Sequence, residues 1–467
     1  MEPIPPSAPR LAALLGGLTD GLLERDTAAR LMLLAALAQE HVLLIGPPGT
    51  AKSELARRLH RSLDGVRYFE RLLTRFSTPE DLFGPISLKS LEDDRYERLT
   101  EGYLPTAGIA FLDEVFKANS AILNALLTLL NEREFDNGSG RVATPLVSLV
   151  GASNEGPLDE ALQAFHDRFL LRVPVAPVSD GAFEALLRLV PVEPQAGVAP
   201  LRAAECDALR HRAAGVRLGD EAIAACTQLR RWLACQGRAL SDRRWRQWMD
   251  LLRVAAASEG RTEVDALDLW LAPYVAADQP AQVPALATWF EAELLRAVPL
   301  EAPWLTRAVE AFEQQLQLEL RPRDDAEGDD AAGKLALARS LGATTGPDDG
   351  VGMLRIVSAE LERQRRRHYS PAHVQARSAQ VDELLAQVDA EHAGCVALAE
   401  ALAARLADRF WWPPELHRRV LAAHAHTAAV LAALRARLQQ VRSGFAGLPI
   451  DPASTEPAPP PVELEPA

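Results

Sequence analysis

The sequence HVLLIGPPGTAKSELARRL, residues 41–59, places a strand, a tight turn and a helix in direct succession. The apolar run 41–45 ends at Gly46, as a buried strand does, and a helical pattern begins at about Lys52. A turn in this position is typical of a phosphate loop, where successive backbone N–H groups and the helix N-terminus surround phosphate oxygens. The chain is therefore expected to bind ATP.

The turn and the first helical residues supply the predicted nucleotide-binding positions, namely Gly46, Pro47, Pro48, Gly49, Thr50, Ala51, Lys52, Ser53 and Glu54. Lys52 is expected to bridge the β- and γ-phosphates, and the Ser53 hydroxyl to ligate Mg²⁺. The usual pattern has Gly directly before the Lys, whereas Ala51 stands here, which a φ below zero would tolerate. The alternative interpretation is a strand-to-helix turn that holds no ligand.

A second apolar run, IAFLDE at 109–114, ends in the paired acids Asp113 and Glu114. The carboxyl ends of parallel strands face the ligand crevice of a sheet. Asp113 is therefore expected to hold the Mg²⁺ shell, and Glu114 to orient and deprotonate the attacking water. The alternative is an acidic helix start. The position about sixty residues after the phosphate loop favours the catalytic interpretation.

Three polar residues further along complete the predicted site. Asn154, after the apolar run 146–150, is expected to hydrogen-bond the γ-phosphate or the water, or else lies in an ordinary turn. Arg168 is expected to reach a neighbouring subunit's γ-phosphate, or else pairs with Asp167 on the surface. Arg243 is expected to contact the phosphates from a helical domain; Arg244 in that role, or an exposed-face role, is the alternative.

The apolar runs alternate with helical patterns, such as the one at 120–131, so the chain is expected to have an α/β fold with a parallel sheet covered on both faces. Later segments are helical, with two long helices at about 354–410 and 414–441. The predicted domains are an αβα nucleotide-binding domain at 1–178, an all-α lid at 179–278, a triple-helical stalk at 279–452 with a flexible acidic segment at 321–352, and a disordered tail at 453–467.

Composition excludes several classes of protein. The formal net charge of −14 over 467 residues argues against broad nucleic-acid binding, including the DNA-remodelling class. Four widely spaced cysteines predict neither a disulfide framework nor a zinc site. No early apolar run is long enough to span a bilayer, and residues 1–10 show no secretory signal. A cytoplasmic protein without a membrane span is expected.

The order of these motifs resembles the MoxR branch of the AAA+ ATPases, and within it the RavA subgroup. The resemblance covers most of residues 20–275 and is carried by GLLER (21–25), GPPGTAKS (46–53), TRFSTPEDLFGPIS (74–87), RYERLTEGYLP (95–105), FLDEVFKA (111–118), LLTLLNEREF (126–135), ASNE (152–155), DRFLLRV (167–173) and LSDRRW (240–245). It implies a homo-hexameric, ATP-driven remodelling machine that uses Mg²⁺. It also implies a partner protein with a von Willebrand factor A domain.

The resemblance assigns a role to each predicted site residue. Lys52 and Ser53 match the phosphate-loop positions, Asp113 and Glu114 the magnesium and water positions, and Asn154 the first sensor. Arg168 matches the trans-acting arginine finger, and Arg243 matches the second sensor. Glu24 and Arg25 lie where the N-terminal segment of the family passes the adenine.

The chain departs from the subgroup in its stalk. Relatives carry a β-rich insertion of about a hundred residues, where this chain has only about thirty to forty acidic, Gly-rich residues. The lysine decarboxylase interaction attributed to that insertion is therefore not expected. Trp411 and Trp412 predict a packed helix junction, or else an exposed docking tip. Segments 83–105 and 133–141 suit hairpins that face the substrate or the ring pore, or else plain surface loops.

These observations leave two functional hypotheses. The first is an ATP-hydrolysing chaperone that remodels or matures a client, for example by inserting a metal or cofactor. The second is a nucleotide-gated scaffold in which hydrolysis is incidental. The intact set of Glu114, Asn154 and Arg168 favours the first.

Overall fold

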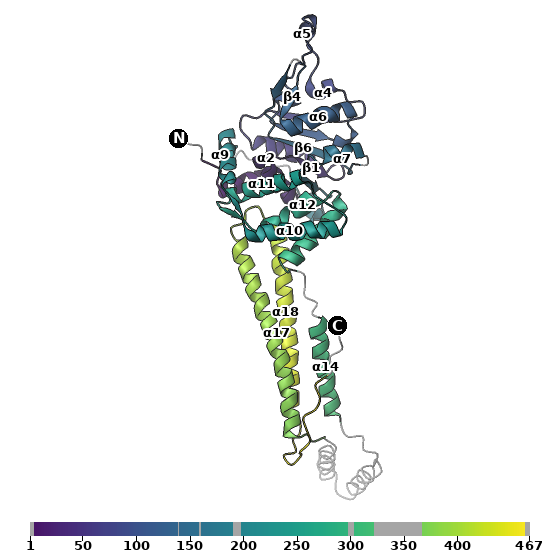
Figure 1. Ribbon diagram of the computed structural model, residues 1–467, viewed down its shortest axis with the longest axis vertical. Helices are drawn as coiled ribbons and strands as arrows, with labels where there is room; N and C mark the ends of the chain where they lie inside the picture. Colours follow the sequence, from purple (N-terminus) through teal and green to yellow (C-terminus); the bar gives the residue numbers. More distant parts are fainter. Residues whose placement is uncertain are drawn as a thin grey trace. The chain divides into compact units, whose positions relative to one another are not determined.

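The computed structural model describes residues 4–138, 140–157, 160–189, 198–297, 303–321 and 367–462 (Figure 1). The chain divides into two compact units, one formed by residues 1–298 with 405–420 and the other by 299–404 with 421–467. Each is described by itself. The domain limits expected at 178, 278 and 452 stay predictions, and the acidic segment 321–352 lies, except for Arg321, outside the described residues.

The first unit is built on a five-stranded sheet in which every pairing is parallel, so the predicted α/β class is confirmed. The strand order is β2 (Tyr68–Leu72), β3 (Ile109–Asp113), β6 (Ser148–Ser153), β1 (Val42–Ile45) and β7 (Leu171–Pro174). The central strands β1 and β6 are buried along their whole length, because helices pack over the sheet. Among these helices, α2 (Asp26–Ala38) packs on β1 and β7, and α3 (Lys52–Arg61) packs on β3.

The helical pattern at residues 12–39 forms two helices. They are α1 (Ala8–Thr19) and α2, separated by a short break. Within the break, Gly21 and Glu24 have φ angles of 65° and 55°, which end a right-handed helix. The break places Glu24 and Arg25 beside the phosphate loop.

A helical lid follows the sheet, as predicted. Its main helices are α9 (Ala203–Ala214), α10 (Asp220–Cys235), α11 (Asp242–Ser258) and α12 (Ala272–Ala276). The structure adds one short parallel pair between β8 (Arg217–Leu218) and β9 (Glu263–Val264). Strands of two residues are too short to produce an alternating pattern, which is why the sequence gives no sign of them.

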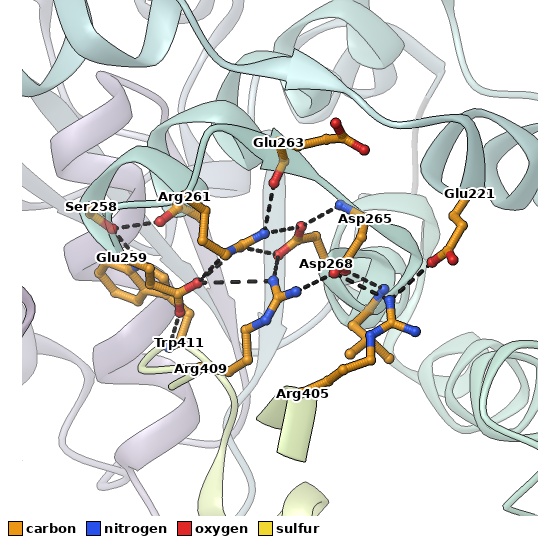
Figure 2. Close-up of polar contacts among 12 residues, drawn as sticks. Glu221, Ser258, Glu259, Arg261, Glu263, Asp265, Asp268, Arg405, Arg409 and Trp411 are labelled. Atoms are coloured by element: carbon orange, nitrogen blue, oxygen red, sulfur yellow. Dashed lines mark hydrogen bonds and ion pairs between the residues drawn. The ribbon is translucent and has the colours of Figure 1, made fainter. Parts of the chain in front are cut away.

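The loop after α17 (Pro371–Leu406) is bound to the lid by buried charges (Figure 2). Arg409 pairs with Asp265 and, at 2.9 Å, with Asp268, while Arg261 also holds Asp268 at 2.6 Å. Trp411 donates from Nε1 to the Ser258 hydroxyl at 2.8 Å. Trp411 and Trp412 are only 2% and 4% exposed, so the packed junction is confirmed and the docking tip is excluded.

Within its described residues, the second unit has three helices that share a common core. Figure 1 shows α17 and α18 (Pro414–Ala446) side by side, and α14 (Pro303–Leu320) contributes to the same core cluster. The composition predicts disorder from residue 453, whereas residues 456 and 460 are hydrogen-bonded to the N-terminal end of α17. Arg377 donates to the Pro460 carbonyl at 2.9 Å, and Ser370 donates to the Glu456 carbonyl at 3.0 Å.

The two segments expected to be hairpins differ. The segment 133–141 leads into a true hairpin of β4 (Glu134–Asp136) and β5 (Arg141–Ala143), with φ 77° at Gly138. The segment 83–105 holds one antiparallel bridge, between Ile86 and Arg98, and carries the short helix α5 (Leu88–Glu92) at its tip (Figure 1). Ser87 caps that helix by accepting from the Ser90 N–H, which ends the strand-like alternation. Within the described ranges, none of the helices has the length and apolar character needed to cross a membrane.

Candidate nucleotide site

The phosphate loop connects β1 to α3, as predicted. Gly46 is required at the end of β1, because a Cβ there would lie 2.0 Å from the Val175 carbonyl oxygen. Lys52 begins α3, and its Nζ donates to the carbonyls of Gly46 at 2.7 Å and Pro47 at 2.8 Å. Burial lowers the pKa of Lys52, and the charges of Asp113 and Glu114 oppose that shift. Lys52 is therefore close enough to Asp113 and Glu114 for their charges to interact.

Ala51 does not have the backbone conformation that the sequence analysis required of it. Its φ is 65°, in the left-handed region, instead of below zero. A Cβ in that region approaches the following carbonyl oxygen and costs about 1–2 kcal/mol. The loop therefore keeps the turn that a Gly would make at this position, and the alanine carries the strain.

The paired acids and Asn154 meet at the same edge of the sheet. Asp113 ends β3, and Asn154 follows β6 directly. The Asn154 side-chain amide donates to Glu114 Oε1 at 2.8 Å, and the Glu114 N–H donates to Asp113 Oδ1 at 3.0 Å. Glu114 has φ 53°, so the chain turns sharply after β3 and directs the carboxylate toward Asn154. The structure thus brings these three predicted residues together.

Lys117 is a member of the site that the sequence analysis missed. Its Nζ lies 3.2 Å from Glu114 Oε1, the same oxygen that accepts from Asn154. The signal was the spacing, since a lysine three residues after an acid lies on the same side of a helical turn. Only four lysines occur in the chain, which also marks this position.

The oxygen donors at this edge suit Mg²⁺. Asp113 offers a half-buried carboxylate, and Ser53, in the first turn of α3, offers a half-buried hydroxyl. Mg²⁺ prefers such hard ligands and takes its remaining ones from phosphate and water. No group of three or more His, Cys, Asp or Glu side chains suited to a metal occurs in the part of the chain that the structure describes.

Arg25 is hydrogen-bonded to the phosphate loop, and Glu24 is hydrogen-bonded to the segment that follows β7. Arg25 is buried, and it donates to the Thr50 carbonyl at 2.9 Å and to the Ala176 carbonyl at 2.8 Å. Glu24 accepts from the Ser179 N–H at 2.8 Å and from its hydroxyl. These contacts put the N-terminal segment beside the phosphate loop, while the predicted adenine contact stays a prediction. Glu54 pairs with Arg58 at 2.8 Å on its own helix.

The two predicted arginines lie at the opposite edge of the sheet. Arg168 precedes β7, which runs parallel to β1, so it stands near the amino end of the strands. Arg243 lies in the same region, because its neighbour Arg244 donates to the Phe169 carbonyl at 3.0 Å and Gln247, one turn further along α11, donates to Glu40 at 3.0 Å. Burial raises the pKa of Glu40 and lowers the pKa of His41, and the charge of Arg243 acts to lower the pKa of both residues, which directly precede β1.

This position bears on the role expected for Arg243. Four strand residues separate the amino end of β1 from the phosphate loop, at about 3.3 Å each. Arg243 therefore lies away from the phosphate loop of its own chain, and its contact with phosphates stays a prediction. Its side chain is exposed at that edge, beside Arg168.

The alternatives for these two positions are Arg244 as the phosphate contact and a surface pairing of Arg168 with Asp167. Arg244 is 2% exposed and donates to the backbone carbonyls of Phe169 at 3.0 Å and Leu170 at 3.1 Å, so it anchors the lid to the sheet and is not a phosphate ligand. Arg168 lies 4.0 Å from Asp167, which Arg244 approaches more closely at 3.5 Å. The pairing of Arg168 with Asp167 is therefore weak.

Comparisons with known proteins agree with this arrangement. Residues 9–196 match the family described as the MoxR domain in the MoxR-vWA-beta-propeller ternary systems, and residues 221–290 match the AAA lid domain family. An uncharacterized protein of Methanocaldococcus jannaschii is 40% identical over 265 residues, which are 55% of this chain and 69% of that protein.

Two further relatives are similar over shorter segments. A second uncharacterized protein of the same organism is 41% identical over 249 residues, covering 53% of this chain and 64% of that protein. The chaperone MoxR1 of Mycobacterium tuberculosis is 31% identical over 181 residues, covering 37% of this chain and 46% of the chaperone. The matched part of the chain thus spans about two thirds of the first two proteins and less than half of the third.

Proposed function

The chain belongs to the MoxR family of AAA+ ATPases, and from this we propose that it binds ATP with Mg²⁺ and hydrolyses it as one subunit of a ring. One observation carries the proposal. Lys52, the acids Asp113 and Glu114, and Asn154 converge at the carboxyl edge of the sheet, where the phosphate loop also lies.

Each of these residues has a step to perform. The loop amides and Lys52 would hold the β- and γ-phosphates, and Ser53 and Asp113 would hold Mg²⁺, which would neutralise charge on the phosphates. Glu114 would take the proton of the attacking water. Asn154 fixes the Glu114 carboxylate, to which it donates at 2.8 Å.

Arg168 and Arg243 act on a neighbouring subunit. They share the edge of the sheet that is opposite their own phosphate loop, so a nucleotide within their reach belongs to another copy. A guanidinium delivered in this way stabilises the charge of the transition state and raises the rate by about 10³–10⁵. Hydrolysis therefore depends on assembly, and the resemblance noted above suggests a hexamer.

The experiment that tests the proposal uses two substitutions at the carboxyl edge. Lys52→Ala removes the charge that holds the phosphates, so nucleotide binding is lost. Glu114→Gln keeps the shape of the side chain but cannot accept the proton, so the variant binds ATP and turns it over very slowly. Normal hydrolysis by Glu114→Gln, measured as phosphate release, would show that another group is the base.

The purpose of the hydrolysis belongs to the same proposal. We infer a chaperone-type motor, acting in the cytoplasm, that remodels or matures a client protein together with a von Willebrand factor A domain partner. The matched family is described from systems that contain such a partner, which supports this inference. Placement in the RavA subgroup rests on the motif resemblance, and lysine decarboxylase is not expected as a partner. The chaperone role is tested by capturing and identifying the proteins that bind the Glu114→Gln variant in the presence of ATP.

The second candidate is a nucleotide-gated scaffold. The pairing of Lys117 with Glu114 at 3.2 Å is compatible with a scaffold, because a carboxylate paired with a cation is a weaker base and would activate water more slowly. The two candidates differ in Arg168→Ala. A motor loses most of its turnover in that variant, whereas a scaffold with incidental hydrolysis keeps its low rate.

A further inference from the structure

The helix α8 (Asp180–Leu187) exposes apolar side chains along its whole length. None of its residues is buried, and Phe183 and Leu187 are 52% and 70% exposed. Apolar surface gathered in this way marks an interaction site, because its burial is favourable by about 25 cal/mol per Å². The helix lies on the nucleotide side of the subunit, since Ser179 at its start is bound by Glu24, the neighbour of the loop-supporting Arg25.

A groove of matching character lies between α10 and α11. It has a volume of about 420 Å³, and among the side chains that line it are Ile223, Cys226, Arg230, Trp245, Arg246 and Met249. Ile223 is 50% exposed. The groove adjoins the arginine edge of the subunit, because Asp242 both lines it and directly precedes Arg243.

These two features lie on opposite sides of one subunit, so they can face each other only across a junction between two subunits. A neighbour whose Arg168 and Arg243 reach the nucleotide also brings its groove to the side on which α8 stands. We propose that α8 of one subunit docks into the α10–α11 groove of the next. The inference rests on the proposed action of the arginines on a neighbour, and it deepens that proposal by naming the protein surfaces that hold the junction.

The pattern of side chains supports a second copy as the occupant. Asp180, Phe183, Glu184 and Leu187 have the spacing of one helix face, with two acids beside two apolar residues. The groove is lined by apolar side chains together with two arginines, Arg230 and Arg246, and one acid, Asp242, so its charged lining is mainly basic. Acids of α8 therefore meet arginines of the groove, and Phe183 and Leu187 meet Trp245 and Met249. Such a contact joins two different surfaces, so repetition closes a ring.

The test begins with one charge placed on each surface. Leu187→Glu alters α8, and Ile223→Glu alters the groove; both positions are exposed, so the subunit keeps its fold. Each variant is expected to assemble about tenfold more weakly or worse in ATP and Mg²⁺, as measured by sedimentation velocity. Leu320→Glu is the matched control, since Leu320 is 53% exposed and belongs neither to α8 nor to the groove. Its assembly should be unchanged.

Mixing the two variants sharpens the test. A Leu187→Glu subunit keeps an intact groove, and an Ile223→Glu subunit keeps an intact α8, so one sound junction forms between them. The mixture should give heterodimers that do not grow into rings, with turnover restored in part. Unchanged rings in both single variants would overturn the inference, whether α8 is then covered by its own chain or by a different protein.

A failure of the docking proposal can be told apart from a failure of the proposed function of Arg168. If Leu187→Glu and Ile223→Glu lose the ring while Arg168→Ala hydrolyses normally, the docking stands and the trans action of Arg168 is wrong. If Arg168→Ala loses turnover while both charge variants keep normal rings, the trans action stands and the docking is wrong.

Discussion

Ala51 shows how a single methyl group changes the phosphate loop. Its φ of 65° is the conformation that Gly adopts without steric cost and that alanine adopts with strain. The Ala51→Gly variant is therefore expected to raise the free energy of unfolding by up to about 1 kcal/mol, because the strain it removes exceeds the extra entropy of the unfolded chain. Urea unfolding of both proteins measures this. A variant that is less stable by the same amount would mean that residue 51 does not hold a left-handed backbone.

Glu40 makes stability depend on pH. Burial raises its pKa to about 7, and Arg133, Gln247 and Arg243 oppose the shift only in part. In the unfolded chain the same group titrates near its ordinary pKa of 4.5. Between these values the folded state binds more protons, so stability falls as the pH rises from 4.5 to 7 and is level above that range.

The Glu40→Gln variant removes this titration. It should be more stable than the parent at pH 8, by roughly 1–2 kcal/mol, and should differ little from it at pH 4.5. The amide oxygen introduced at position 40 can still accept from the Gln247 side chain, which donates to Glu40 at 3.0 Å in the parent. Urea unfolding at both pH values is the measurement. An equal effect at the two pH values would assign the change to packing and not to the proton.

At the scale of elements, the junction after α17 depends on buried charge. Arg409 is 6% exposed as a side chain and faces Asp268, which is 5% exposed, at 2.9 Å. The Arg409→Met variant leaves Asp265, Asp268 and Glu259 with fewer cations, and it should lower the free energy of unfolding by about 3–5 kcal/mol.

Arg405 is the matched control for this prediction. It pairs with Glu221 at 2.9 Å and Asp265 at 3.2 Å, but its side chain is 42% exposed. The Arg405→Met variant should therefore cost less than about 1 kcal/mol. Similar losses in the two variants, measured by thermal or urea unfolding, would mean that burial does not set the strength of this network.

At the scale of the whole molecule, the position of Arg168 predicts complementation between inactive subunits. A Glu114→Gln subunit supplies an intact Arg168, and an Arg168→Ala subunit supplies an intact Glu114. Equimolar mixing should restore phosphate release at junctions where these two residues meet, although each variant alone is slow. A mixture no faster than the sum of its parts would show that Arg168 serves its own chain.

The residues nearest the phosphate loop could be predicted from the sequence because the site is local there. Lys52 and Ser53 follow a strand at fixed spacing, and Asp113, Glu114 and Asn154 each end a recognisable apolar run. The spacing did not reveal where Arg243 lies, since spacing does not say which edge of the sheet a later helix approaches. Lys117 was missed although it stands three residues after Glu114, because that spacing brings the two side chains together only if the chain turns between them, as it does here.

Local pattern was sufficient for the class of fold, the parallel sheet and the helical lid, because hydrophobic periodicity and short-range turn chemistry act along the chain. It left open whether Trp411 and Trp412 are packed, which the structure decided. Tertiary structure alone decided that the arginines and the phosphate loop occupy opposite edges, that Ala51 is left-handed, and that the tail contacts α17. These depend on which distant segments come together, and the free energy of such contacts is not encoded in any short window of residues.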